Sequence, residues 1–363
     1  MNLERAISTF RGHTVPHFRI VQQRRRWAIA SGIVILLSLA GFLVRGINLS
    51  IEFTGGTQLL YENPSGATVD AIRGTLAAEP FAREAAEIQS VGSGGVSVRT
   101  TSLTDLTPDE RTALIAALAD QAGIEPEAIS QQVVGPTWGA QISRQALIGL
   151  IVVLLAITLY ITLRFEWKMA IGAMVALLHD VVITGGIYAL SGREVAPATV
   201  IAILTILGFS LYDTVVIYDK VKENADNPAM LGRATYEEVA NTSMNQVFMR
   251  SVNTSLVVIL PIISLLFFGG ATLKDFALAM LIGTTTGAYS SIFIATPLLV
   301  VLKEREPKMT MLRHRLEREG QRHRDDAAPV AAVATAPVAA VLPSAGATSP
   351  RPRRTKPKRK RRR

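Results

Sequence analysis

Long apolar segments dominate the hydropathy pattern of this chain. Each has about the ~20 residues that an α-helix needs to cross a hydrocarbon layer of ~30 Å. The pattern therefore predicts an α-helical membrane protein with six transmembrane helices, and an even number of spans places both termini on the same side. The segments occupy residues 27–44, 145–163, 170–190, 197–218, 252–269 and 276–302.

The composition agrees with this prediction. Hydrophobic residues make up 49% of the 363 residues and charged residues only 18%, which is outside the range of ordinary soluble proteins. A cleavable signal peptide is an alternative for the first segment, because Ser38-Leu39-Ala40 resembles a processing site. The apolar run continues to Val44 and the six-span topology needs this helix, so we prefer a retained transmembrane helix.

Lysine and arginine residues beside the segments set the expected orientation. They precede the first span and occupy the 2–3 and 4–5 loops, which the positive-inside rule places in the cytoplasm. These cations are Arg24, Arg25, Arg26, Arg164, Lys168, Lys220, Lys222 and Arg233. The expected domains are a cytoplasmic N-terminal segment at 1–26, transmembrane helix 1 at 27–47, an extracytoplasmic α/β domain at 48–143, transmembrane helices 2–6 at 144–302 and a cytoplasmic basic tail at 303–363.

The long segment between the first two spans has the pattern of a small α/β domain. Its elements are expected in the order βαββαβ, the ferredoxin-like split arrangement. Thr68 and Thr107 are the expected helix caps, the second in a capping box with Glu110. The expected strands are 49–61, 86–91, 96–101 and 128–134, with a glycine-rich turn at 92–95; the expected apolar helix faces are Val69, Ile72 and Leu76, and Leu114, Ile115 and Leu118.

The net charge of +9 belongs to the C-terminal tail. Residues 303–363 carry eighteen Lys and Arg against six acids, and the stretch 327–348 is too poor in large apolar residues to pack, so most of the tail is expected to be disordered. Anionic lipid is the expected partner of this tail, because nothing in it reads base edges and no specific nucleic acid is implied. The chain has no cysteine, which excludes disulfides and thiolate chemistry, and no cofactor is expected.

Asp213 interrupts the fourth apolar segment and is the leading candidate for chemistry. A carboxylate inside the membrane costs roughly 2.5–3.5 kcal/mol even on the lenient insertion scale, so it is expected to face a partner, a cavity or a proton path. Arg250 is expected to start the fifth span at a similar depth. In this pair, Asp213 is the acid that gains and loses a proton. Arg250 is a fixed positive charge that favours the ionised form of Asp213. The alternative is a static buried pair that fixes helix register.

Other polar and small residues in the spans are candidates for relay or packing. His179 and Asp180 lie near mid-depth of the third span, where they could relay protons or form hydrogen bonds between helices. Gly283 and Gly287 have the spacing of a close helix contact, with Ser290 and Ser291 on approximately the same face. We expect Gly55 and Gly56 to relieve backbone crowding beside the first strand, and Pro261 to kink the fifth span.

Metal binding is not expected. The remaining histidines, His13, His17, His314 and His323, lie in the terminal segments, and no spacing of the HExxH kind occurs in the sequence. No arrangement of catalytic residues is recognisable either.

Five motifs in the correct order resemble the SecF half of the SecD/SecF protein-export family. They are IEFTGGTQL (51–59), VGPTWGAQI (134–142), RFEWKMAIGAMVALLHD (164–180), GFSLYDTVVIYDKVKEN (208–224) and the FFGG turn (267–270). The resemblance runs from about residue 27 to residue 302 and leaves the basic tail outside. It implies a six-span half of a resistance-nodulation-division type membrane domain.

The resemblance also implies a function and partners. It implies a non-enzymatic subunit of the bacterial cytoplasmic membrane that works with a SecD-like second half beside the SecYEG channel and uses the proton-motive force to help move unfolded secreted polypeptide. In that pattern, Asp213 and Arg250 match the acid and the arginine implicated in proton flow. Two other functions remain open: one half of a small-molecule exporter of the same superfamily, and a structural tether of the translocon without proton coupling.

Overall fold

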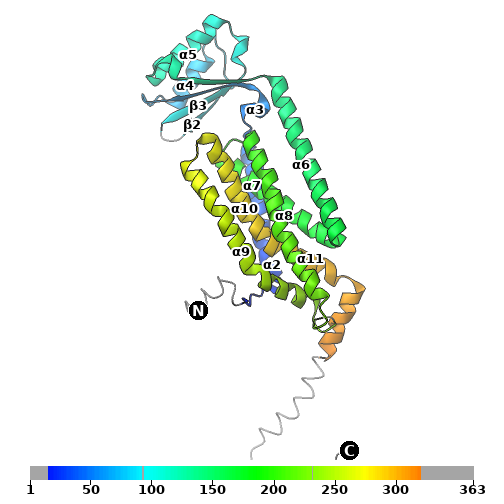
Figure 1. The fold of residues 1–363 in the computed structure, drawn as a ribbon. Coiled ribbons are helices and arrows are strands. Elements are labelled where there is room, and N and C mark those ends of the chain that lie inside the picture. Colours follow the sequence, from blue (N-terminus) through cyan, green and yellow to red (C-terminus); the bar gives the residue numbers. More distant parts are fainter. Residues whose placement is uncertain (1–14, 92–93, 231, 320–363) are drawn as a thin grey trace, which may run out of the picture. The chain divides into compact units, whose positions relative to one another are not determined.

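The computed structural model describes residues 15–91, 94–230 and 232–319. Among them are six helical segments long and apolar enough to cross a membrane, which confirms the predicted spans (Figure 1). Five spans are single helices: α2 (Arg24–Arg45), preceded by the short helix η1 (Val21–Gln23), α6 (Pro136–Arg164), α7 (Trp167–Ser191), α8 (Pro197–Ala225) and α9 (Tyr236–Phe268). The sixth span is α10 (Ala271–Ser290), the π-helical segment η4 (Ser291–Ala295) and α11 (Thr296–Glu304).

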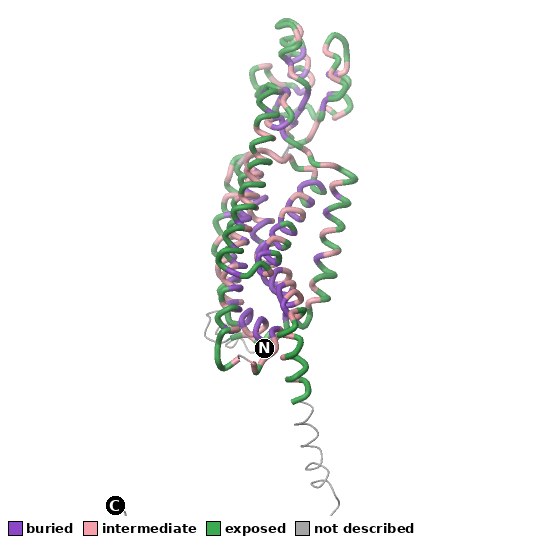
Figure 2. Tube along the Cα trace, turned by 90° about the vertical axis from the view of Figure 1, so that its right-hand side faces the viewer, coloured by how far each residue is buried: buried purple, intermediate pink, exposed green. Residues whose placement is uncertain are grey.

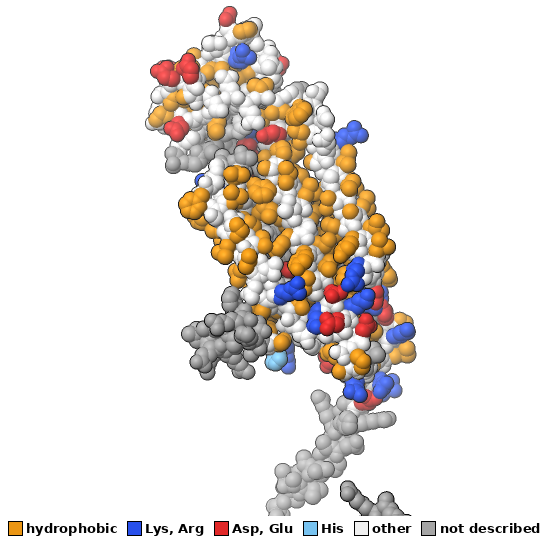
Figure 3. Space-filling view, in the orientation of Figure 1, with side chains coloured by type: hydrophobic (Ala, Val, Ile, Leu, Met, Phe, Trp, Pro, Cys, Tyr) orange, Lys and Arg blue, Asp and Glu red, His pale blue; other side chains and the backbone are white. Residues whose placement is uncertain are grey.

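The outer surface and the interior of the bundle differ as a membrane protein requires. Figure 3 shows hydrophobic side chains along the flank of the helices, with Lys, Arg, Asp and Glu gathered where α2 begins and α11 ends, which we call the terminal end. Buried residues lie inside the bundle and inside the α/β domain (Figure 2). Residues 314–319, in a separate compact unit, are helical, and most of the predicted basic tail, at 320–363, lies outside the described residues.

Two helices extend beyond the predicted apolar segments. Helix α6 begins at Pro136, so the boundary expected after residue 143 falls inside a helix. Helix α9 begins at Tyr236 rather than at 252, with Thr235 as its N-cap in a capping box with Glu238. Hydropathy detects only the apolar part of a helix, and the first turns of α9 are polar. Arg250 is therefore an interior residue of α9 and not its start.

The α/β domain, residues 56–134, is a four-stranded antiparallel sheet with two helices. The chain order is β1 (Gly56–Glu62), α4 (Val69–Ala77), β2 (Glu87–Val91), β3 (Gly95–Thr100), α5 (Pro108–Ala122) and β4 (Ser130–Val134), and the strand order in the sheet is β2-β3-β1-β4. Figure 1 shows both helices on one face of the sheet. Leu59, Ile72, Leu76, Leu114 and Leu118 form the core between them.

The helix caps in this domain are those predicted. Thr68 accepts a hydrogen bond from the Ala71 amide at 3.2 Å. Thr107 and Glu110 form a reciprocal capping box, and these hydrogen bonds lower the pKa of Glu110. Of the predicted turn at 92–95, residues 92 and 93 lie outside the described residues.

The segment before β1 differs from the predicted strand. Residues Ile51–Thr54 form the short helix α3, capped by Gly55. Gly55 and Gly56 have φ values of 75° and 123°, which disfavour residues with a Cβ, and a Cβ on Gly56 would lie 2.4 Å from the Thr100 carbonyl oxygen. The double glycine thus reverses the chain between α3 and the sheet, where β3 comes close.

The buried side chain of Arg99 in β3 links the sheet to the ends of two membrane helices. It donates to the Leu49 carbonyl at 2.6 Å and to Asn48 after α2, and it pairs with Glu87. Its Nε lies 3.4 Å from Glu194, in the loop before α8. Burial raises the pKa of Glu194, and the Arg99 guanidinium opposes this rise.

The variant Glu194→Gln tests the electrostatic balance at this junction. The pKa of Glu194 in the folded chain is raised above its ordinary value of 4.5, so ionisation of Glu194 destabilises the folded state. This cost is absent below pH 4.5 and grows as the pH rises through the raised pKa. The melting temperature of the glutamine variant relative to wild type should therefore increase from about pH 4.5 towards pH 8. Thermal unfolding of the full chain in detergent measures this trend.

The control is Glu62→Gln, at an exposed position of β1. A difference between Glu194→Gln and wild type that does not change with pH would contradict the assignment.

Candidate functional site

Buried polar side chains gather between α7, α8, α9 and the sixth span. On α8, Ser210, Asp213 and Thr214 have the i, i+3, i+4 spacing of one helix face and are at most 2% exposed. The other members of this polar cluster, all buried, are His179 and Asp180 on α7, Ser251 on α9, Ser290 at the end of α10 and Ser291 in η4. Polar groups at membrane depth need internal partners, so this cluster is the candidate site.

Asp180 joins three helices through hydrogen bonds. Its Oδ2 accepts from the hydroxyl of Ser210 in α8 at 2.7 Å and from that of Ser290 in α10 at 2.9 Å. Its Oδ1 lies 3.1 Å from Nδ1 of His179. The sequence analysis gave hydrogen bonds between helices as one of two roles for Asp180, and these are such bonds. They hold α7, α8 and α10 in one register.

His179 lies beside Asp180 but has different neighbours. Its ring stacks on Tyr289 with centroids 6.0 Å apart, and the Tyr289 hydroxyl is 2.9 Å from Oγ of Ser31 in α2. Its Nε2 atom is buried and has no hydrogen-bond partner within the described part of the chain. His179 therefore connects the Asp180 carboxyl to the interface with α2.

Asp213 is buried and forms no ion pair with the residues that the structure describes. Its Oδ2 atom has no hydrogen-bond partner among the described residues. Ser251 of α9 lies close to this carboxyl, and the charge of Arg250 acts on it electrostatically. The Arg250 side chain is exposed and donates from Nη2 to the Tyr212 hydroxyl at 3.3 Å. The structure thus places the predicted acid and arginine on neighbouring helices but does not join them.

Gly283 and Gly287 allow α10 to pack directly against α8. A Cβ on Gly283 would lie 2.3 Å from Ile206, and one on Gly287 would lie 2.8 Å from Cβ of Ser210. Because Ser210 donates to Asp180, the absence of a side chain at Gly287 also positions a member of the polar cluster.

The π-helical segment η4 interrupts the sixth span beside this cluster. The Ser291 hydroxyl donates to the Ser210 carbonyl at 3.1 Å and lies 2.8 Å from the Thr214 hydroxyl. The Tyr218 hydroxyl donates to the Ala295 carbonyl at 3.2 Å. The Tyr218 hydroxyl of α8 thus satisfies a backbone carbonyl of η4, while the Ser291 hydroxyl of η4 donates to a backbone carbonyl of α8.

No group of three or more His, Cys, Asp or Glu residues in the described ranges is arranged to hold a metal ion. The histidines at 13 and 323 lie outside those ranges. Pro261 lies inside α9, which continues through it to Phe268.

The sequence analysis did not select Ser210, Thr214, Ser251 or Tyr289. The spacing of Ser210 and Thr214 around Asp213, one face of an otherwise apolar helix, would have identified the first two. The π-helix and the stacking of Tyr289 have no comparable pattern in the sequence.

Comparisons with known proteins agree with the sequence motifs. The model of the family "Protein export membrane protein SecD/SecF, C-terminal" matches residues 114–305, and the model "SecD/SecF GG Motif" matches residues 40–62, which contain Gly55 and Gly56. The chain is 44% identical over 300 residues to the protein translocase subunit SecF of Mycobacterium tuberculosis strain H37Rv, covering 79% of this chain and 67% of that protein. It is 39% identical over 304 residues to SecF of Streptomyces coelicolor, covering 82% and 80%.

A solved structure is similar as well. The crystal structure of SecDF from Thermus thermophilus, described as a translocon-associated membrane protein, aligns with a TM-score of 0.71 and 34% sequence identity. The alignment covers 80% of this chain and 39% of the SecDF chain, so the present chain spans about two fifths of that protein.

The variant Gly287→Ala tests the packing that positions Ser210. The added methyl group would overlap Ser210, so we expect a loss of about 1–3 kcal/mol in the free energy of unfolding, measured by denaturant or thermal unfolding in detergent. Gly208→Ala in α8 is the matched control, because a Cβ there meets no atom within 4 Å. Equal effects of the two substitutions would show that the α8–α10 contact is not tight.

Proposed function

Because this chain belongs to the SecD/SecF family of protein-export membrane proteins, we propose that it is a translocase subunit that couples proton movement across the membrane to late-stage protein translocation. The observation that carries the proposal is Asp213, a buried acid in a membrane helix whose Oδ2 has no hydrogen-bond partner within the described ranges. An acid in such surroundings is favourable in its neutral form, and it becomes charged only when a compensating positive charge comes close.

Arg250 is the proposed compensating charge. Its guanidinium donates to the hydroxyl of Tyr212, the residue before Asp213. A change in side-chain conformation or a small rotation of α9 would move the guanidinium from Tyr212 to the carboxylate. The two arrangements, arginine on Tyr212 with a neutral acid and arginine on an ionised acid, are the proposed states of the cycle. One charge crossing the membrane supplies about 2.3 kcal/mol per 100 mV, enough to bias such an equilibrium.

A SecD-like second half is the proposed partner at this face. Tyr212 and Ile201 of α8 are 50% and 58% exposed, and the exposed Arg250 lies on the same side of the chain. A charged side chain facing lipid is costly, so we expect protein to cover this surface. That the chain spans two fifths of SecDF supports a complementary half.

The proposed setting is the bacterial cytoplasmic membrane, with both termini cytoplasmic beside the SecYEG channel. The α/β domain, ferredoxin-like in its strand order, would then be extracytoplasmic and contact unfolded polypeptide. Arginine and lysine residues around the loops at the terminal end support this orientation. The basic tail would lie against anionic lipid. Asp180 and His179 would hold the helices together or relay protons towards Asp213.

Asp213→Asn is the decisive variant. We expect it to abolish the part of export that depends on the proton gradient, because asparagine neither binds nor releases a proton under these conditions, while the ATP-driven stage continues. The measurement is completion of secretory-protein export in membrane vesicles that contain the full chain, its SecD-like partner and the channel, after ATP is removed and a proton gradient is imposed.

Asp219→Asn is the control, since Asp219 lies on the same helix but is exposed and pairs with the exposed Arg164. Full gradient-driven export by Asp213→Asn would remove this acid from the mechanism and leave the chain as a structural tether.

A further inference from the structure

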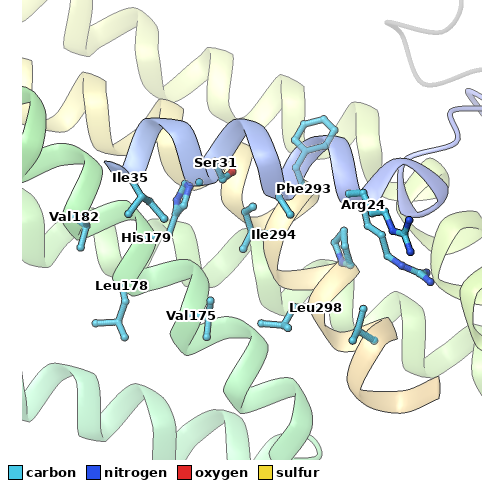
Figure 4. A pocket seen from close by; sticks show the side chains of 15 residues that line it. Arg24, Ser31, Ile35, Val175, Leu178, His179, Val182, Phe293, Ile294 and Leu298 are labelled. Atoms are coloured by element: carbon cyan, nitrogen blue, oxygen red, sulfur yellow. The ribbon is translucent and has the colours of Figure 1, made fainter. Parts of the chain in front are cut away.

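An apolar cavity of about 690 Å³ lies between α2, α7 and the sixth span, away from Tyr212 and Arg250. Figure 4 shows the side chains that line it, with Arg24 at one end and Ile35 and Val182 at the other. Its volume is in the range of ~300–1,000 Å³ typical of ligand sites. On the α2 side, the lining residues Ala28, Ser31 and Gly32 are small and take up little of the cavity. A Cβ on Gly32 would meet no atom within 4 Å.

The length of this cavity matches the acyl chains of one lipid leaflet. From Arg25 to Ile35 the α2 wall rises by about 15 Å, roughly half of a ~30 Å hydrocarbon core and therefore one leaflet. An alkyl chain, about 4 Å thick at carbon contact distance, can lie along this length.

The mouth of the cavity is cationic. Arg24 is held by Glu237 at 2.9 Å and by Glu304 at 3.7 Å. Arg25 is exposed at the same mouth and forms no ion pair with any residue in the described part of the chain. The unpaired guanidinium thus lies where the headgroup of a lipid would lie if its chains filled the cavity.

We propose that this cavity binds one phospholipid with an anionic headgroup from the leaflet at the terminal end. The acyl chains fill the space along Gly32 and Ile35, and the phosphate lies against Arg25. His179 lines the same cavity, so a bound lipid covers the outer side of the His179–Asp180 pair. This site is formed by ordered helices and is separate from the basic tail.

The test uses the full chain, with any stably associated partner, in nanodiscs of equal parts phosphatidylglycerol and phosphatidylcholine. Native mass spectrometry after gentle release measures the retained lipid. We expect one retained phospholipid, with phosphatidylglycerol favoured about fivefold, the ratio that ~1 kcal/mol for one basic residue gives. Arg25→Gln should bring this preference close to one, and Arg26→Gln, which changes a neighbouring arginine outside the cavity, should keep it.

A second pair of variants tests the part of the cavity that would bind the acyl chains. Gly32→Phe places a ring in open space within the cavity and should remove the retained lipid without lowering the melting temperature. Ala30→Phe, at an exposed position of α2 that does not line the cavity, should retain it. Lipid retention by Gly32→Phe equal to wild type would overturn the proposal. Equal headgroup preferences of Arg25→Gln and Arg26→Gln would also overturn it. The same holds if the wild-type chain retains no phospholipid because a partner helix covers the cavity.

Discussion

The hydrogen bonds of Asp180 are the interaction on which the membrane part of this structure depends. A carboxyl group at membrane depth has no water to bind, so neighbouring helices must supply its partners. Ser210 and Ser290 do so from α8 and the sixth span. This requirement explains the small residue at Gly287, which lets Ser210 approach, and it brings α10 and η4 into close contact with α8. Removing both hydroxyl donors would leave the buried Oδ2 acceptor without these hydrogen bonds.

Asp213 shows the opposite solution to the same problem. Both acids are almost fully buried, but Oδ2 of Asp180 accepts two hydroxyl hydrogen bonds whereas Oδ2 of Asp213 accepts none from the described residues. A satisfied carboxyl fixes one arrangement of helices. A carboxyl oxygen without a hydrogen-bond partner does not fix the helices in this way, and the proposed coupling step requires that freedom.

The loop before the helix that carries Asp213 is linked to the α/β domain. Just before α8, Val195 pairs with the backbone of Asn48 and Ser50, and Glu194 lies against Arg99 of β3. A displacement of α8 would therefore act on this junction without passing through a flexible linker. Ser210 of α8 also bonds Asp180, so contacts connect the polar cluster through α8 to the sheet. This continuity is a physical basis for the proposed coupling.

The sequence by itself determined the six spans, the two capped helices and the strand order along the chain, and it selected Asp213 as a candidate, because each depends on local hydrophobicity or on contacts three or four residues apart. The tertiary structure decided the rest. It showed a helix at Ile51–Thr54 in place of a strand, an α9 that begins before its apolar part, and an Arg250 that binds Tyr212 instead of Asp213. The cavity beside α2 likewise exists only because residues from three distant segments pack together. Hydropathy and spacing describe a helix in isolation, whereas hydrogen-bond partners and empty space depend on which helix faces lie opposite each other.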